Sequence, residues 1–154
     1  MRYEKVIFCS NDCTYRAPVA AEILRKTLQE KSQLTDIAIE AKGITVMFTE
    51  PVNGKALAIG KSKGYNLEKY VAASISNTDF HMNTLVFVMT DIDKTKLYDR
   101  YIEAINVYTI KEYLGMSGDI EMPFGLSLAK YGENFNRLEE LVCQLADKLI
   151  YINN

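Results

Sequence analysis

Short apolar runs, separated by segments with helical periodicity, form the main pattern of this chain. Residues 5–10 and 85–89 are almost continuously apolar, which is typical of strands buried on both faces of a parallel sheet. Residues 36–41 and 106–110 have the composition of two further strands, the second of them short. The pattern therefore predicts four strands, and the first of them should be central.

Four segments with helical periodicity follow these strands. The first opens with Pro18, which fits an initial helical turn because its missing N–H is harmless there. A weaker helix is predicted over residues 53–63, and another begins at a cap formed by Thr90 or Asp91 and runs to about Ile102. The last segment has an apolar residue every three or four positions, which predicts one long helix whose stripe is Leu128, Tyr131, Phe135, Leu138, Val142, Leu145 and Leu149.

Strands that alternate with helices predict one α/β domain over residues 1–154. We expect a doubly wound four-stranded parallel sheet with helices on both faces. Ligands of such sheets bind beyond the carboxyl end of a strand, at the point where the winding reverses. The polar loop of residues 11–17, directly after the first strand, is therefore the expected site.

Composition and charge exclude several classes of function. A chain of 154 residues with 48% hydrophobic and 25% charged residues is ordinary for one globular domain. Its formal net charge of -2 offers no basic surface to nucleic acid. No apolar stretch approaches the ~20 residues of a membrane span, and the first ten residues are too weakly apolar for a secretory signal. We expect a cytoplasmic monomer that binds neither nucleic acid nor membranes.

Cysteine and histidine usage limits the available chemistry. The three cysteines, Cys9, Cys13 and Cys143, match neither zinc-site nor redox-pair spacing, and their odd number argues against a disulfide framework. His81 is the only histidine, so a His-rich metal site or a Ser-His dyad would have to be built on it. We therefore expect no metal and no cofactor.

The predicted site loop carries a recognisable arrangement of residues. A hydrophobic strand, a short loop, Arg16-Ala17-Pro18 and an amphipathic helix resemble the phosphate-binding loop of low-molecular-weight protein tyrosine phosphatases and related arsenate reductases. Residues 107–113, residues 118–125 and the final helix resemble the bacterial branch that includes protein-arginine phosphatases. The resemblance covers nearly the whole chain and implies that family's fold.

This resemblance also implies roles that the residues of this chain do not match. The family's loop has a cysteine, five residues, an arginine and then Ser-Pro; the cysteine attacks phosphorus, while loop N–H groups and the arginine hold the phosphate. Counting back from Arg16 without gaps places Ser10 at the nucleophile position. The supporting serine is Ala17, and the general acid, an aspartate before proline, is Met122. Serine does not ionise as cysteine does at a helix N-terminus, and a thioether has no proton to give.

The resemblance further implies a phosphate-binding loop and a pocket wall. The loop consists of Ser10, Asn11, Asp12, Cys13, Thr14, Tyr15, Arg16 and Ala17. Phe48 and Phe124 would line the pocket wall. Asp12 replaces a glycine, and its carboxylate either pairs with Arg16 in place of the phosphate or forms a simple turn. Tyr15 replaces a cysteine, and we expect its ring to fill part of the pocket.

Two main hypotheses follow. The first is a pseudophosphatase, which would bind a phosphorylated or acidic protein. The alternative is an active, divergent tyrosine or arginine phosphatase that forms a cysteinyl-phosphate on Cys9 or Cys13, although the Cys9 thiol should face away from the loop. Asp119 and Glu121 are nearby carboxylates that could replace the missing acid. An arsenate-related enzyme is a third reading, which the lack of a resolving-cysteine arrangement around Cys143 weakens.

Overall fold

The structure of the chain is a computed structural model that describes residues 2–123 and 125–153. Phe124, which the resemblance assigns to the pocket wall, lies outside the described residues. Within those two ranges, none of the helices combines the length and the apolar character that crossing a membrane requires.

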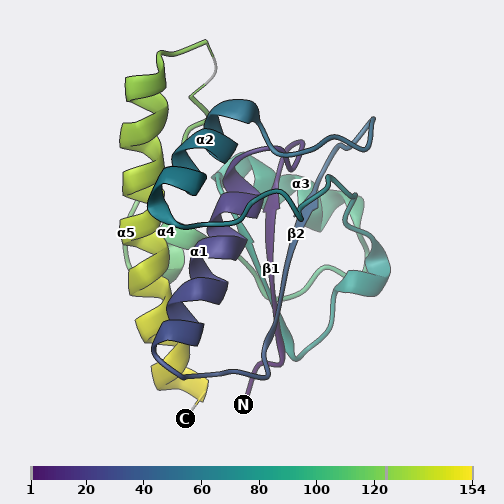
Figure 1. The fold of residues 1–154 in the computed structure, drawn as a ribbon. Coiled ribbons are helices and arrows are strands. Elements are labelled where there is room, and N and C mark those ends of the chain that lie inside the picture. Colours follow the sequence, from purple (N-terminus) through teal and green to yellow (C-terminus); the bar gives the residue numbers. More distant parts are fainter. Residues whose placement is uncertain (1, 124, 154) are drawn as a thin grey trace.

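All four strands of the sheet are parallel, and their order is β2-β1-β3-β4. β1 (Lys5–Ser10) lies between β2 (Ala38–Gly43) and β3 (Thr84–Val88), and β4 (Val107–Thr109) pairs with the outer side of β3. The carboxyl ends of the strands therefore meet at one edge, at the top of the molecule in Figure 1. Because the chain adds β2 on one side of β1 and β3 on the other, its winding reverses beside β1. The predicted fold class is confirmed.

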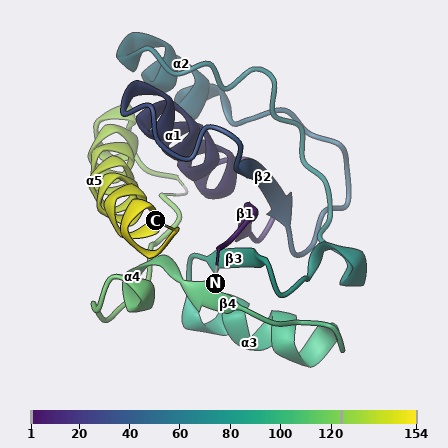
Figure 2. The same ribbon diagram turned by 90° about the horizontal axis from the view of Figure 1, so that it is seen from below.

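Helices cover both faces of the sheet, as the doubly wound arrangement requires. One face carries α1 (Arg16–Glu30), α2 (Gly54–Lys63), α4 (Ile110–Tyr113) and α5 (Leu128–Asn153), and the other carries α3 (Asp91–Arg100) (Figure 2). α1 and α5 lie side by side over the sheet in both ribbon views. This packing fixes the position of the α1 N-terminus, where the expected site lies.

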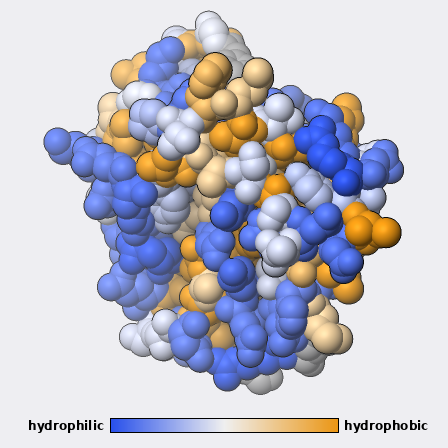
Figure 3. Space-filling model, turned by 90° about the vertical axis from the view of Figure 1, so that its right-hand side faces the viewer, coloured by the Kyte–Doolittle hydropathy of each residue, from blue (hydrophilic) through white to orange (hydrophobic). Residues whose placement is uncertain are grey.

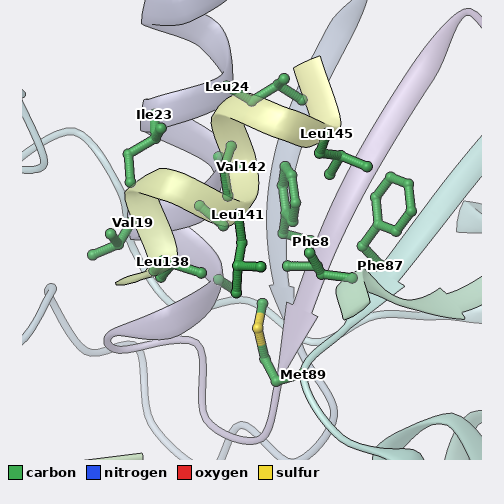
Figure 4. Close-up of a cluster of buried hydrophobic side chains, with 14 of the residues drawn as sticks. Phe8, Val19, Ile23, Leu24, Phe87, Met89, Leu138, Leu141, Val142 and Leu145 are labelled. Carbon is green, nitrogen blue, oxygen red and sulfur yellow. The ribbon is translucent and has the colours of Figure 1, made fainter. Parts of the chain in front are cut away.

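The larger core fills the space between the sheet, α1 and α5 (Figure 4). The rings of Phe8 and Phe87, from neighbouring strands, have centroids 5.7 Å apart beneath the leucines of α5. The predicted stripe of the last helix is buried from Tyr131 to Leu149, whereas Leu128, its first residue, is exposed. Each large apolar side chain buried here stabilises the fold by about 1.5–3 kcal/mol.

A smaller core lies on the other face, between the sheet and α3. Ile7 and Cys9 of β1 belong to it, whereas Phe8 points to the larger core. This alternation follows from the two-residue period of a strand. The predicted orientation of the Cys9 side chain, away from the loop and α1, is therefore confirmed.

Side-chain caps mark where α2 and α3 begin. The side chain of Thr90, rather than that of Asp91, caps α3 by accepting the N–H of Asp93 at 3.1 Å. Asn53 caps α2, and Gly64 ends it in the left-handed region with φ 86°. The pattern did not predict the single turn α4 or the 3-10 turn η1 (Asn77–Asp79), because both are too short to show a period.

Candidate functional site

Residues 10–17, named here the site loop, join β1 to α1 at the carboxyl edge of the sheet, where the sequence predicts the site (Figure 1). Its carbonyl groups are bound by the connection between β2 and α2. Three backbone hydrogen bonds do this, from Ile44 N–H to Ser10 C=O (3.0 Å), Thr45 N–H to Asn11 C=O (2.8 Å) and Asn53 N–H to Thr14 C=O (2.7 Å). The connection therefore supports the site loop along its length.

Close contact between β2 and the site loop requires a glycine at position 43. A Cβ built on Gly43 would lie 2.3 Å from Cγ2 of Val46 and 3.2 Å from Cβ of Cys13. Cys13 itself has a φ of 63°, an uncommon value for a residue with a side chain. The site loop is thus a tight, sterically determined turn rather than a loose surface loop.

Ser10, predicted to stand at the nucleophile position, ends β1 and is 1% exposed. Its Oγ accepts the N–H of Ala17, the second residue of α1, at 3.3 Å. The hydroxyl therefore lies where helix N–H groups and the helix dipole favour negative charge. Among the described residues, neither a carboxylate nor an imidazole hydrogen-bonds to this Oγ.

The histidine of the chain does not belong to this site. His81 precedes β3, so it lies at the amino end of the parallel strands, whereas the site loop lies at their carboxyl end. Its Nδ1 accepts the N–H of Asn83 at 3.1 Å, which is a local turn contact. A Ser-His dyad with Ser10 is therefore not formed.

Arg16 is the first residue of α1 and is 8% exposed. Its Nη1 donates to the carbonyl of Ile120 at 2.9 Å, which ties the site loop to the segment before α5. Burial lowers the pKa of Arg16, and nearby carboxylates act in the opposite direction, namely those of Asp93, Asp12, Glu121 and Asp119. The guanidinium stays charged, since an arginine pKa starts far above neutrality.

The structure decides between the two readings of Asp12. Its Oδ1 accepts both the N–H (3.1 Å) and the hydroxyl (2.9 Å) of Thr14, which forms an Asx turn. In the described part of the chain Asp12 makes no ion pair with Arg16, whose hydrogen bond goes to Ile120. The carboxylate therefore occupies one loop N–H that a bound anion could otherwise use.

The two cysteines beside the site are not activated. Cys9 is 0% and Cys13 2% exposed. Burial raises the pKa of the Cys9 thiol well above its usual value and that of Cys13 to about 11. A nucleophilic cysteine needs the opposite shift and an accessible sulfur. The geometry therefore opposes a cysteinyl-phosphate on either residue.

Of the aromatic residues predicted at the pocket, the two that the structure describes lie in different surroundings. Tyr15 differs from the expectation: its ring is fully buried in the larger core, edge-on to Tyr131 with centroids 5.4 Å apart. The backbone turn before α1 directs it inward. Phe48, by contrast, is 69% exposed on the connection between β2 and α2.

The segment of residues 119–123, which holds the predicted acid position, is fixed from two sides. Ile120 donates its N–H to the carbonyl of Met89 at 2.9 Å, and Asp119 Oδ1 accepts the N–H of Asp91 at 3.0 Å. Met122 packs partly buried against the larger core, and Glu121 is exposed. Asp119 therefore serves the N-terminus of α3, and the predicted acid position is occupied by the thioether of Met122.

Sequence reasoning missed two contributors to the site. One is the carbonyl of Ile120, which no side-chain pattern reveals. The other is Asp93, 5% exposed in the first turn of α3 and acting on the charge of Arg16. The sequence position of Asp93 could have predicted this. A helix that follows a central parallel strand begins at the same edge of the sheet as the site loop.

The parallel sheet, with helices on both faces and a reversal of its winding beside β1, defines a doubly wound α/β protein. Its candidate site is a tight loop that leads into a helix N-terminus, a place that favours anions. A family model described as "Low molecular weight phosphotyrosine protein phosphatase" matches residues 5–151. The chain belongs to this family.

Similar proteins cover nearly its whole length. Low molecular weight protein-tyrosine-phosphatase PtpB of Staphylococcus haemolyticus is 30% identical over 92% of this chain and 96% of its own. Protein-arginine-phosphatase of Bacillus subtilis is 31% identical over 94% of this chain and 95% of its own. One similar solved structure is a cysteine-to-serine mutant of the YwlE arginine phosphatase with a phosphorylated active-site serine. It matches with a TM-score of 0.84 and 27% sequence identity, and the match covers 94% of this chain and 95% of that one.

Proposed function

We propose that this chain is a catalytically impaired member of the family, a pseudophosphatase with a binding or regulatory role toward a phosphorylated or acidic protein. One observation carries the proposal: a serine hydroxyl, and not a thiol, receives the N–H of Ala17 at the start of α1. A thiolate at such a position is a ready nucleophile, whereas a serine needs a base. Ser10 has none among its hydrogen-bond partners in the described residues.

The acid side of the reaction supports the same proposal. Met122 cannot protonate a leaving group, and Asp119 is engaged with the N–H of Asp91. The thiols of Cys9 and Cys13 are buried, and burial raises the pKa of each. Because nucleophile and acid act as one unit, losing both should reduce turnover by many powers of ten.

A binding role is supported by what the site loop retains. Arg16 and the N-terminus of α1 remain in place and favour an anion. The phosphorylated active-site serine in the YwlE mutant supports the view that a serine in a loop of this family can carry a phosphoryl group. A partner therefore has a plausible anchor at this position.

Free phosphate alone should bind weakly. The carboxylates around Arg16 oppose an incoming anion, and Asp12 already occupies the Thr14 N–H. A protein partner can add apolar contacts, because Met47 is 80% and Phe48 69% exposed on the connection between β2 and α2, which is hydrogen-bonded to the site loop. Hydrophobic residues also gather toward the upper end of the face drawn in Figure 3.

The test is hydrolysis of a generic aryl phosphate and of a phosphoarginine peptide by the purified protein. We expect no multiple turnover from the natural chain and recovery of activity in a Ser10→Cys/Met122→Asp variant. A Ser76→Cys variant, changed at an exposed serine far along the chain, controls for a stray thiol. Sustained hydrolysis by the natural protein that disappears in Arg16→Ala would overturn the proposal.

A further inference from the structure

Asp93 is a buried carboxylate that has no partner in the described part of the chain. The residue lies in the first turn of α3 and is 5% exposed. Its backbone N–H donates to Thr90 Oγ1 at 3.1 Å, but no hydrogen bond or ion pair from the described residues reaches its carboxylate oxygens. Glu22, which is similarly buried, is by contrast bound by Arg25 and Tyr70. Because an unpaired buried charge is costly, the Asp93 carboxylate requires an explanation.

A local partner for this carboxylate exists in the sequence but is not used. A threonine followed three residues later by an acidic residue can form a capping box, in which the acidic side chain accepts the threonine N–H. Thr109 and Glu112 form this box at the start of α4, where Glu112 Oε2 accepts the Thr109 N–H at 2.8 Å. Thr90 and Asp93 form only the other half of the box. The Asp93 carboxylate is therefore turned away from the backbone of its own helix.

This carboxylate belongs to the same edge of the sheet as the site loop. Ile120 connects the two, because its N–H binds the carbonyl of Met89 just before α3, and its own carbonyl accepts Arg16 Nη1. Burial lowers the pKa of Arg16, and among the carboxylates that act against this effect Asp93 has the largest influence. The two side chains nevertheless form no ion pair. Asp93 is therefore close to the guanidinium and still free to accept hydrogen bonds from a ligand.

A ligand can reach the Asp93 oxygens through a narrow opening. Among the described residues, Asn134 Oδ1 is the one fully enclosed side-chain oxygen or nitrogen without a hydrogen-bond partner. The unpartnered oxygens of Asp93 are therefore not fully enclosed, and they keep contact with solvent. Since only 5% of the residue is exposed, the opening suits the end of a slender side chain.

Charge at this edge selects a cation, and geometry favours an ammonium group. Four carboxylates act on the Arg16 guanidinium, namely those of Asp93, Asp12, Glu121 and Asp119, so negative charge is in excess there. They come from three separate segments of the chain. The three N–H groups of a lysine ammonium point in different directions on a flexible, narrow stem, whereas a guanidinium needs its acceptors in one plane.

We propose that Asp93 anchors a lysine side chain of a basic segment in a partner protein. The inference rests on the proposed function, in which this chain binds a partner instead of turning over a substrate, and it narrows the partner to one whose bound segment carries lysine. The same carboxylates disfavour an acidic segment. A phosphoryl group on the basic segment would lie toward Arg16 and the start of α1, while the lysine reaches Asp93.

The experiment measures by calorimetry how the natural protein binds three short peptides. In these peptides serine alternates with lysine, with norleucine or with glutamate. We expect only the lysine peptide to bind, and Asp93→Asn to weaken its binding by about tenfold or more, as the loss of one close charge pair does. Asp99→Asn removes the same charge from an exposed position of the same helix, so it is the matched control and should change binding by less than about twofold.

Amide chemical shifts of the natural protein give a second measurement, which does not depend on how well a variant folds. The lysine peptide should shift the amide signals of Thr90, Asp93 and Ile120 more than that of Asp99. Urea unfolding of both aspartate variants checks that each is folded under the conditions of the binding measurement.

The outcomes separate this inference from the proposed function. Equal weakening by Asp93→Asn and Asp99→Asn, equal binding of the norleucine peptide, or no binding of the lysine peptide would overturn the role of Asp93 and leave the pseudophosphatase proposal intact. Sustained hydrolysis of an aryl phosphate by the natural chain would instead overturn the proposed function, whatever the affinity for lysine.

Discussion

A methyl group added at position 43 should disturb the site loop strongly. In Gly43→Ala the new Cβ would lie 2.3 Å from Cγ2 of Val46, 3.2 Å from Cβ of Cys13 and 3.3 Å from the carbonyl carbon of Asp12. Valine is stiff at χ1, so Val46 cannot simply swing away. Either the connection after β2 or the site loop must move.

The size of the effect follows from two opposing contributions. Overpacking of this kind costs about 1–3 kcal/mol, and a contact as short as 2.3 Å belongs in the upper half of that range. Replacing glycine by alanine restricts the unfolded chain, which offsets about 0.4–1 kcal/mol. We therefore expect Gly43→Ala to lower the free energy of unfolding by about 1–2.5 kcal/mol. In a domain of this size each 1 kcal/mol lowers Tm by about 2–4 °C.

Urea unfolding of a double-mutant cycle measures this directly. Val46→Ala removes the atom in the shortest contact, so in its background Gly43→Ala should lose about 1 kcal/mol less than it loses in the natural chain. A control in α5, Gly132→Ala, has nothing within 4 Å of its Cβ and should not depend on Val46. An unchanged stability of Gly43→Ala, or an additive cycle, would refute the close packing described for the loop.

Three further predictions concern buried groups around the site loop and α1. Burial raises the pKa of Glu22, but hydrogen bonds from Arg25, Lys69 and Tyr70 outweigh it and lower this pKa in the folded protein. The stability that ionised Glu22 contributes is therefore complete above its ordinary pKa of 4.5 and is lost as the pH falls through the lower folded pKa. In urea unfolding, Glu22→Gln should be less stable than the natural chain by about 1–3 kcal/mol at pH 7, and this difference should narrow in acid. Arg16→Gln should leave the Ile120 carbonyl without its hydrogen-bond donor and lower the free energy of unfolding by about 1–3 kcal/mol. Limited proteolysis should then cleave the segment between β4 and α5 faster than in the natural chain. Cys9 and Cys13 should resist iodoacetamide at pH 8 in the folded protein and react in urea, as mass spectrometry would detect.

The sequence predicted the sheet well, because apolar runs and the two-residue period of a strand are local signals. Residues 5–10 coincide with β1, and the orientation of Cys9 followed from its place beside Ser10. β2 begins at Ala38, two residues later than predicted, since its exposed edge has a less regular pattern. Only the central position of the first strand was predicted; the order β2-β1-β3-β4 is known from the structure, since no single residue encodes it.

The site was less predictable, since its geometry depends on contacts between distant segments. The sequence allowed Asp12 either to pair with Arg16 or to form a turn. Only the structure, in which Asp12 accepts hydrogen bonds from the N–H and hydroxyl of Thr14, shows that it forms the turn. Tyr15 was expected in the pocket, but the side chain turns inward to Tyr131, more than a hundred positions along the chain. The hydrogen bond of Arg16 ends on a backbone carbonyl, which carries no sequence signature.

Most of the contacts that shape the site loop do not involve the two side chains at the predicted nucleophile and acid positions. Its shape depends on backbone hydrogen bonds to the connection after β2, on the missing Cβ of Gly43 and on the Arg16 to Ile120 bond. None of these involves the side chains at positions 10 and 122. A serine and a methionine can therefore occupy those positions without loss of the fold, and restoring a cysteine and an aspartate there should need no rebuilding of the loop. Under the proposed function, the same separation would explain how the site loop keeps the helix terminus of α1 without the groups that complete turnover.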